Sequence, residues 1–455
     1  MWNPFSFQGL AELLAQGESD IVAHTGKSRL SETAPVADVS RKRAVVGRQT
    51  GNALPEIRAE NRATGRYLLR TDISRFYHSV YTHSIPWALH GKTWAKAHRD
   101  EGLGGDLDRA LRNGQGGQTL GIPVGPDSSL VIAEIIGCAV DAAIQNLLPH
   151  GFRFVDDYEL TFDSRADAEA GLARLEEALS GFELAINPRK TSIDPLPQPL
   201  EADWLHAIRE YDFGFGNVSS KDLLRYFNLV FNLQQQRSTE PVIPYAVGRL
   251  RAESVGDGEW LLFQNLLFQC AMVEPACLPS IFAHLSRHSV LGTSPSLPIV
   301  LDRILQTHSV LGHASEVAWA LWIAIWFRLD LSQESAQAVS RNDDPIVALL
   351  ALHARDKGLF RGALDVTAWQ SRVSRDELYD RNWLLVYEAL QKQWLTVPGV
   401  GDPVAADPNF EQLKAKSVSF YDLDPSVSVA ELVEVTGYAL ESPSDEGQPE
   451  ENDEY

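Results

Sequence analysis

Cysteine is scarce in this chain. Only three occur among 455 residues, Cys138, Cys270 and Cys277, and none of them stands at a spacing typical of metal ligands. A disulfide framework and a cysteine zinc site are therefore excluded as organising features. This cysteine usage fits a reducing compartment such as the cytoplasm.

Long apolar runs and an N-terminal targeting pattern are also missing. The longest apolar run, residues 317–327, is too short to span a bilayer and predicts a buried helix. The first residues lack a basic stretch followed by an apolar core, so no secretion signal is expected. We therefore expect a soluble cytoplasmic protein that does not use a membrane as a partner.

Positive charge is in deficit, with 40 Lys and Arg against 61 Asp and Glu and a net charge of -21. This balance disfavours a protein that holds long duplex by charge alone, because phosphate contacts need Lys and Arg. The deficit is uneven along the chain. Residues 441–455 hold seven acids and no base, whereas residues 1–70 hold ten Lys and Arg against seven acids.

The rest of the composition is that of a globular protein, 44% hydrophobic and 22% charged, and the length allows two or three domains. Residues 1–66 are mixed and contain the basic run Arg-Lys-Arg at 41–43. Strand-like and helix-like patterns alternate over 67–204, which predicts an α+β sheet with helices on one face. Within it we expect a segment rich in His, Trp and Lys at 83–96, a long apolar helix at about 129–148, a helix capped by Ser164 and ended by Gly181, and a last strand at 183–187. Helical spacing dominates 205–400, and eight of the eleven tryptophans lie from residue 204 onward. Trp319, Trp322 and Trp326 share one helix face and are expected in the core. Residues 401–455 predict an acidic, partly disordered tail.

An acid pair, Asp156 and Asp157, lies in the middle of a strand-like alternation. Apolar residues stand at positions 152 and 154 before the pair and at 160 and 162 after it. This pattern predicts strand, tight turn and strand, with both acids at or beside the tip of the hairpin. Adjacent carboxylates repel each other, and a chain that keeps them together often uses them to hold cations.

A further acid, Asp72, ends a short strand-like stretch at 67–72. An acid at the end of one strand and an acid pair on a neighbouring hairpin make a minimal cage for two Mg²⁺ ions that bridge phosphate oxygens. Such a cage suits reactions at phosphate groups.

Four motifs carry a resemblance to a known family. They are Asp72 with Tyr77, Gly-Ile-Pro-Val-Gly-Pro at 121–126, Phe-Val-Asp-Asp at 154–157 and Asn-Pro-Arg-Lys-Thr at 187–191. Their order and spacing resemble the palm motifs of reverse transcriptases over roughly residues 66–200. The resemblance implies a reduced fingers segment at 1–66, a polymerase palm at 67–204, and a large all-α C-terminal domain at 205–400, which we expect to be a degenerate stack of helix pairs.

The resemblance also implies metal ligands. Asp72 and Asp156 would bridge two Mg²⁺ ions, for which Mn²⁺ can substitute, and Asp157 would be a weaker ligand or an ordinary turn residue. Lys190 falls where the family places a lysine near the leaving pyrophosphate, although a lysine at a strand end is also commonly just a surface residue.

Substrate contacts are implied as well. Tyr77 would pack under the sugar and exclude a 2′-hydroxyl, unless it is ordinary packing. Arg75 would contact the triphosphate or form a salt bridge. Gly121, Pro123 and Gly125 would let the backbone approach the templating base and the nucleotide.

One departure from the family narrows the match. Gln often precedes the first glycine of the second motif, but this chain has Leu120 there, with Gln118 two positions earlier. This departure points away from retroviral and intron enzymes. Together with Thr-His-Ser-Ile-Pro-Trp at 82–87, the second motif is similar to that of bacterial abortive-infection and antiphage-defence reverse transcriptases.

The sequence thus predicts a nucleotidyltransferase, an RNA-directed DNA polymerase that acts on deoxynucleoside triphosphates with RNA or single-stranded DNA, and that serves defence against phage. Two alternatives stay open: a templated enzyme of a retroelement, and a non-catalytic scaffold acting through its helices. We expect the helical half to pack on the palm and to offer a surface for self-association or for the product strand.

Overall fold

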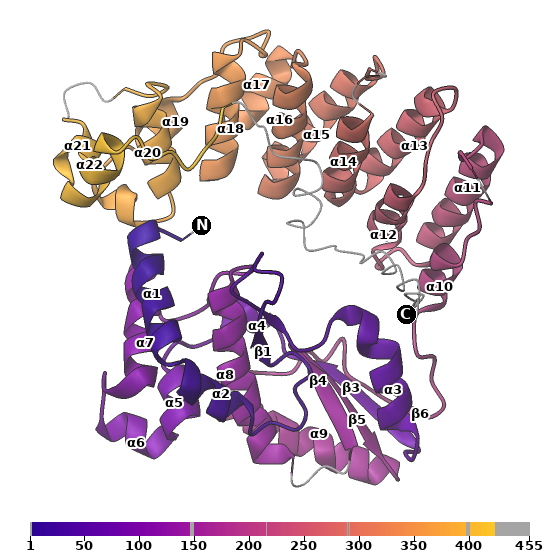
Figure 1. Cartoon of the computed structure of the whole chain (residues 1–455), viewed down its shortest axis with the longest axis vertical. Coiled ribbons are helices and arrows are strands. Elements are labelled where there is room, and N and C mark those ends of the chain that lie inside the picture. Colours follow the sequence, from indigo (N-terminus) through magenta and orange to yellow (C-terminus); the bar gives the residue numbers. More distant parts are fainter. Residues whose placement is uncertain are drawn as a thin grey trace, which may run out of the picture. The chain divides into compact units, whose positions relative to one another are not determined.

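The computed structural model describes residues 2–145, 150–214, 216–288, 290, 292–396 and 401–423. The chain forms two compact units (Figure 1). The first consists of Met1–Glu201 with Tyr379–Arg381, and the second consists of the remaining residues from Ala202 onward. The strongly acidic segment 441–455 lies outside the described residues.

The first unit combines helices with two small sheets. Its helices are α1 (Pro4–Gln16), α2 (Glu18–Thr25), α3 (Leu54–Arg62), α4 (Phe76–Ser79), α5 (Ser84–His90), α6 (Lys92–Ala97), α7 (Gly102–Gly114), α8 (Asp127–Ile144) and α9 (Arg165–Ser180), with the 3-10 turn η1 (Gly51–Ala53). Its strands are β1 (Pro35–Ala37), β2 (Val45–Gly47), β3 (Tyr67–Asp72), β4 (His150–Phe154), β5 (Asp157–Phe162) and β6 (Ser192–Pro195).

The main sheet has the strand order β4-β5-β3-β6, and all neighbouring strands are antiparallel. Successive side chains of a strand point to opposite faces, so each strand contributes to two environments. On one face Leu69, Leu160 and Phe162 join the apolar core with residues of α8 and α9. The mixed α+β architecture expected from the sequence is confirmed at this level.

The sequence predicted helices on only one face of this sheet. That prediction is incomplete, because α3 lies against the other face. There Glu159 accepts hydrogen bonds from Arg58 Nε at 2.8 Å and from Arg62 Nη2 at 2.6 Å. A carboxylate in the middle of a strand loses most of its contact with water, and two guanidinium groups compensate for that loss. The need to neutralise Glu159 thus explains the position of α3.

The expected local elements are largely present. The hairpin around the acid pair and the strand ending at Asp72 are confirmed. Ser164 caps α9 by accepting the Asp167 backbone N–H at 3.1 Å, and Gly181 follows its last residue. The long apolar helix ends at Ile144 within the described residues.

The strand expected at 183–187 is wrong. Only Ile186 makes an isolated bridge there, to Ile73, and the edge strand is instead β6 at 192–195. The turn that closes α9 occupies the start of this segment, where Glu183 N donates to Ser180 O at 3.1 Å and Leu184 N to Leu179 O at 3.0 Å. A second turn follows, in which Lys190 N donates to Asn187 O at 3.0 Å, and Pro188 cannot donate to a ladder, so the chain pairs with β3 as a strand only from Ser192.

A buried ion cluster joins β4 to α8. Arg153, fully buried, donates to Glu134 from Nη1 and Nη2 at 2.9 Å and to Asp141 from Nη2 at 2.8 Å. Burial alone would raise the pKa of Glu134, but the charge and hydrogen bonds of Arg153 outweigh it and lower that pKa. Four hydroxyls complete the cluster, from Ser28, Ser31, Thr33 and Tyr158.

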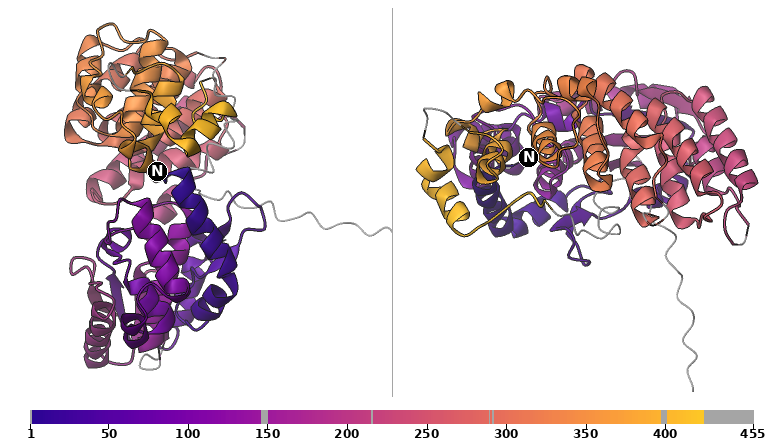
Figure 2. Two further views of the ribbon diagram at one scale, coloured as in Figure 1. Left: turned by 90° about the vertical axis from the view of Figure 1, so that its left-hand side faces the viewer. Right: turned by 90° about the horizontal axis from the view of Figure 1, so that it is seen from above.

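The second unit is helical throughout its described residues, apart from isolated bridges and short 3-10 turns. Its helices are α10 (Asp203–Arg209), α11 (Ser220–Gln236), α12 (Val242–Arg249), α13 (Trp260–Val273), α14 (Leu278–Arg287), α15 (Leu297–Leu311), α16 (Ala314–Phe327), α17 (Gln333–Val339), α18 (Pro345–Asp356), α19 (Thr367–Gln370), α20 (Trp383–Gln391), α21 (Pro403–Ala406) and α22 (Pro408–Ala415). They follow one another in chain order along a row (Figure 2).

Packing in this row joins many helices both to the next helix, as α15 to α16, and to the helix two positions further on. Contacts link α12 to α14, α14 to α16, α16 to α18 and α18 to α20, and likewise α11 to α13, α13 to α15 and α15 to α17. Such pairing arranges the helices in two layers. Trp319 and Trp326 of α16, expected in the core, are half-buried and pack on Phe282, with ring centroids 6.0 and 5.1 Å away.

Two features of this unit concern earlier expectations. The helices α21 and α22 lie in the segment expected to be a tail, so ordered structure extends to Ala415 at least. In the part of the chain that the structure describes, no helix is both long and apolar enough to cross a bilayer.

We predict that Arg153→Leu destabilises the first unit by about 3–5 kcal/mol, because it leaves two buried carboxylates without a counter-charge. The free energy of opening should be measured in the full chain by hydrogen exchange of the β4 and β5 amides. Arg165→Leu, which removes an exposed ion pair with Glu169, is the control and should cost less than about 0.5 kcal/mol. Equal effects of both variants would contradict the prediction.

Candidate functional site

Three carboxylates lie close together where β3 ends and β5 begins. Asp72 is the last residue of β3 and Asp157 the first of β5, and the register places them directly opposite each other. Side chains opposite each other in an antiparallel pair lie on the same face. Asp156, in the turn before β5, accepts the Ile73 N–H on its backbone oxygen at 3.0 Å, and its carboxyl is close enough to that of Asp72 for the two charges to interact.

The turn that carries Asp156 is strained. Val155 has a φ of 56°, a left-handed conformation that a β-branched residue rarely adopts. The buried cluster holds it, because Arg153 Nη1 donates to Val155 O at 2.7 Å and Val155 N donates to Thr33 Oγ1 at 2.9 Å. Strain of this kind persists only where the surrounding structure over-determines it, and it is common at functional sites.

The carboxylates carry electrostatic stress. Desolvation raises the pKa of Asp156, and the negative charge of Asp72 adds to the rise. Desolvation followed by the charges of Asp156 and Asp72 raises the pKa of Asp157 to about 6. Carboxylates that repel one another in this way attract a cation strongly.

One ammonium and one amide partly offset this repulsion. Lys190 Nζ lies 3.2 Å from Asp72 Oδ1, and Asn187 Nδ2 donates to Asp72 Oδ2 at 3.0 Å. Desolvation acts to lower the pKa of Lys190, but its hydrogen bond to Asp72 and the negative charges of Asp72, Asp157 and Asp156 together outweigh this and raise the pKa. Lys190 therefore stays charged, and most of its side chain is exposed.

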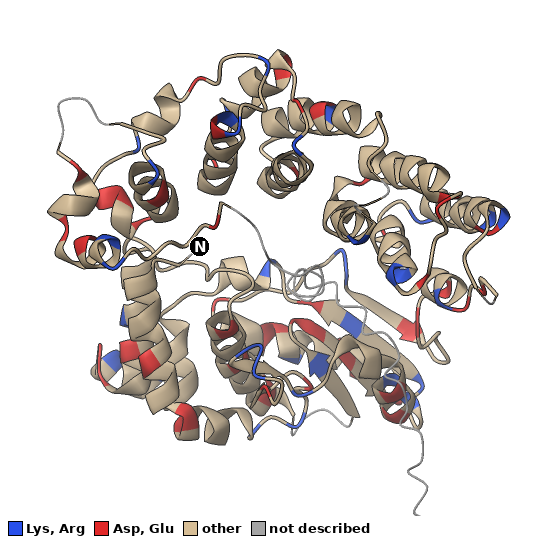
Figure 3. Cartoon of the chain, turned by 45° about the horizontal axis from the view of Figure 1, so that its top comes forward, with Lys and Arg blue, Asp and Glu red and all other residues tan. Residues whose placement is uncertain are grey.

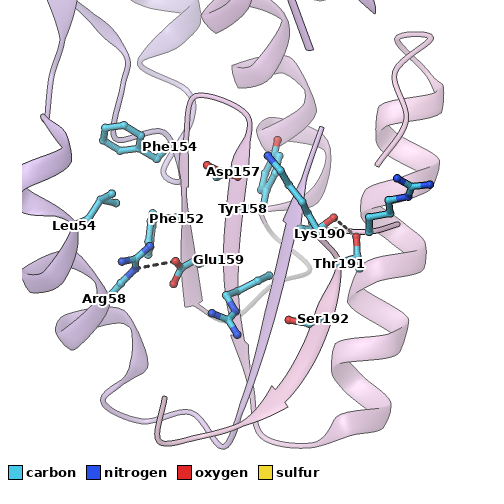
Figure 4. Close-up of a pocket in the computed structure, with 13 residues that line it drawn as sticks. Leu54, Arg58, Phe152, Phe154, Asp157, Tyr158, Glu159, Lys190, Thr191 and Ser192 are labelled. Atoms are coloured by element: carbon cyan, nitrogen blue, oxygen red, sulfur yellow. Dashed lines mark hydrogen bonds and ion pairs between the residues drawn. The ribbon is translucent and has the colours of Figure 1, made fainter. Parts of the chain in front are cut away.

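A hollow of about 420 Å³ adjoins the site (Figure 4). It lies over the sheet face that carries Arg70, Asp157 and Glu159, and Lys190 and Thr191 line it from the turn before β6. The sheet bears both acidic and basic side chains (Figure 3). Arg189 also lines the hollow, is exposed, and makes no side-chain ion pair within the described residues.

The carboxylates do not form a closed cage. Within the described residues, no group of three or more His, Cys, Asp or Glu side chains is arranged to hold a metal ion. Mg²⁺ usually takes only one or two carboxylates and completes its shell with water and phosphate oxygens. The neighbouring carboxyls of Asp72 and Asp156, both hard oxygen donors, fit this kind of binding.

Tyr77 and the Gly-Pro turn are brought together next to the acids. Tyr77 is half-buried, and desolvation together with the charge of Asp156 raises its pKa to about 12. Its backbone oxygen accepts the Ile122 N–H at 2.8 Å. Position 121 favours glycine for two reasons: its φ is 87°, and a Cβ there would lie 3.2 Å from His78 O. The side chain of Phe76, the residue before Tyr77, is buried in the core.

The other expected substrate contacts, Arg75, Pro123 and Gly125, are exposed or half-buried. Arg75 has a φ of 48° and an exposed side chain, and the salt bridge considered for it is absent from the described residues. Pro123 is half-buried, and Gly125, with a φ of 109°, is exposed. Gln115 rather than Gln118 reaches the turn, donating to Gly121 O at 3.0 Å.

Sequence reasoning missed three partners of the site. Asn187 donates a hydrogen bond to Asp72, and Arg153 holds the turn that carries Asp156. Arg43 connects the β1–β2 hairpin to the Gly-Pro turn. Arg43 Nε donates to Asp127 Oδ1 at 2.7 Å and Nη2 to Gly125 O at 3.1 Å. A basic residue in the middle of a strand pattern, as at 153, was the one available signal of a buried counter-charge.

Comparison with models of known protein families and with curated proteins gives no match for this chain.

We predict that Asp157→Asn stabilises the protein at pH 7 in EDTA, by about 1 kcal/mol or less after solvent screening. The folded protein keeps the Asp157 proton up to about pH 6, whereas the unfolded chain releases it near pH 4. Wild-type stability therefore falls as the pH rises through this window, and the advantage of the variant grows.

Urea unfolding midpoints at pH 4.5 and pH 7 test this expectation. Asp163→Asn, just beyond the opposite end of β5, is the control for loss of an exposed acid away from the site. An advantage of Asp157→Asn that is no larger at pH 7 than at pH 4.5 would refute the electrostatic account of the site.

Proposed function

We propose that the chain is an RNA-directed DNA polymerase, a nucleotidyltransferase whose first unit is a polymerase palm. The observation that carries the proposal is the convergence of Asp72 and Asp156 at the ends of adjacent strands, with Lys190 beside them. The four sequence motifs that resemble those of reverse transcriptases all lie in this unit and flank this point.

Asp72 and Asp156 would hold divalent cations, with Asp157 as the weaker ligand. Magnesium or manganese, when bound, neutralises charge on the phosphates and on the attacking oxygen. The raised pKa values of Asp156 and Asp157 support this role, because desolvation and mutual repulsion both disfavour the bare negative charges, and a bound cation would offset both. Asn187 orients the Asp72 carboxylate through Oδ2 and leaves its other oxygen to Lys190.

The remaining residues have roles that follow from their positions. Lys190, charged and largely exposed, can place its ammonium next to the pyrophosphate and donate a proton to it. The Tyr77 ring, fixed by its backbone bond to the Gly-Pro turn, would exclude a 2′-hydroxyl from the sugar site. The exposed Arg75 and Arg189 are available to phosphate oxygens.

The second unit would be a degenerate array of helix pairs that replaces a thumb. Packing of many helices against both the next helix and the one two positions on is expected of such arrays. We propose that it serves self-association or holds the product strand, and that the enzyme acts in defence against phage. A scaffold role is less favoured, because a purely structural site gains nothing from mutually repelling carboxylates.

Asp156→Asn should lower deoxynucleotide incorporation at least about a hundredfold, since the site loses a ligand charge where charge develops in the reaction. Incorporation of labelled deoxynucleoside triphosphates should be measured with Mg²⁺, both on a primed RNA template and without any added template. Asp163→Asn is the matched control and should retain activity. A folded Asp156→Asn protein that works at the parent rate would eliminate the proposal.

Tyr77→Ala should raise ribonucleotide use relative to deoxynucleotide use by about tenfold or more, because removing the ring opens space for the 2′-hydroxyl. The measurement is the ratio of kcat/KM for the two substrates. Tyr77→Phe keeps the ring and should keep the ratio. A ratio unchanged in Tyr77→Ala would mean that the tyrosine is a packing residue.

A further inference from the structure

A second hollow, of about 490 Å³, lies in the first unit and is lined by residues of α5, α6 and α7. Figure 1 labels these three helices. It shares no lining residue with the hollow beside Asp157. It is built from the segment rich in His, Trp and Lys at residues 83–96 and from one side of α7, which the polymerase proposal leaves without a role. Its volume is in the range of small-ligand sites.

Aromatic rings form one wall of this hollow. The ring of Tyr81 contacts His83 edge-on, with centroids 4.9 Å apart, and Trp87 with centroids 5.7 Å apart. All three side chains are half-buried, so part of each remains accessible. Lys92, which does not line the hollow, donates from Nζ to Gly181 O and lies 4.1 Å from the Trp87 ring. Such rings can accept a planar base by stacking.

A buried carboxylate fixes the orientation of the histidine. Asp108, 3% exposed, binds His83 Nδ1 at 2.7 Å and accepts from Arg112 Nε at 3.2 Å. An ionised carboxylate can only accept, so His83 Nδ1 carries the proton and Nε2 is the nitrogen left for another partner. The surroundings of Asp108 thus hold a polar atom ready at the aromatic wall.

Positive charge dominates the opposite side. Lys96, Arg99 and Arg112 line the hollow against the acids Asp100 and Asp108. Arg112 is committed to both acids, at 3.2 Å from each. Lys96 and Arg99 are exposed, and in the part of the chain that the structure describes their side chains have no ion pair or hydrogen bond. Both cations are therefore available to a phosphate at this hollow.

We propose that this hollow binds a nucleoside phosphate, either as a free nucleotide or as one unit of a single strand. The rings of Tyr81 and Trp87 would contact the base, His83 Nε2 would bind a polar edge, and Lys96 and Arg99 would bind the phosphate. The site adjoins the Gly-Pro turn through the bridge between Tyr81 and Leu120. It does not depend on the polymerase activity.

The test uses the full chain in EDTA with three probes: thymidine monophosphate, an eight-nucleotide oligodeoxythymidylate and pyrophosphate. Kd is measured by titration, and hydrogen exchange reports which segments become protected. Lys96→Ala/Arg99→Ala should weaken binding of both thymidine probes about tenfold. Arg165→Ala/Arg174→Ala removes the same charge from exposed positions of α9 and should change Kd less than about twofold.

Protection of residues 81–112, with the loss confined to the first double variant, supports the proposal. Tighter binding of the oligonucleotide than of the monophosphate then assigns the site to a strand, and equal binding assigns it to a free nucleotide. Pyrophosphate that binds as tightly as the monophosphate would overturn the role of the base. Three results would overturn the site itself: an equal loss of binding in both double variants, no protection of residues 81–112, or loss of probe binding in Asp156→Asn. A finding that the protein has no polymerase activity would not affect this proposal.

Discussion

A guanidinium buried with two carboxylates, that of Arg153 with Glu134 and Asp141, ties the β4–β5 hairpin to α8. The attachment of the hairpin to α8 depends on all three charges, because removing any one of them leaves the others uncompensated in the interior. The same guanidinium reaches Val155 O, and a hydroxyl of the N-terminal segment reaches Val155 N. The position of the turn is therefore set from the core side of the sheet.

That anchoring explains how the opposite side can carry stress. The turn keeps Val155 in a strained conformation and holds Asp156 against Asp72, although the charges repel. A flexible hairpin would relax by moving the carboxylates apart. Because the hairpin is fixed at its base, the repulsion persists and adds to the rise in the pKa values of the two acids. A bound cation would relieve this repulsion, which would strengthen its binding.

The segment after β3 connects the two proposed sites. Tyr77 contributes to the first, and Tyr81, four residues later, lines the second. Between them the backbone is tied to the Gly-Pro turn, with Gly121 N donating to Val80 O at 2.8 Å. Both sites thus use side chains of residues 77–81, whose backbone is hydrogen-bonded to the Gly-Pro turn. This attachment favours precise positioning of these side chains over mobility.

Much of this organisation could be predicted from local pattern. Alternation placed the hairpin and β3, Ser164 and Gly181 bounded α9, and helical spacing predicted an all-helical stretch after residue 204. These features depend on interactions between residues close in sequence, where propensity and capping decide. The acids at 72, 156 and 157 were singled out by residue type and position at strand ends.

What the sequence could not show depends on residues far apart in the chain. The register that sets Asp72 against Asp157, the position of α3 over Glu159, and the partners of Arg153 arise only when the sheet and α8 come together. The strand expected at 183–187 failed because the turn at Asn187 and the pairing of β6 with β3 decide that edge. Pairing, burial and charge compensation are properties of the folded core, and no local pattern carries them.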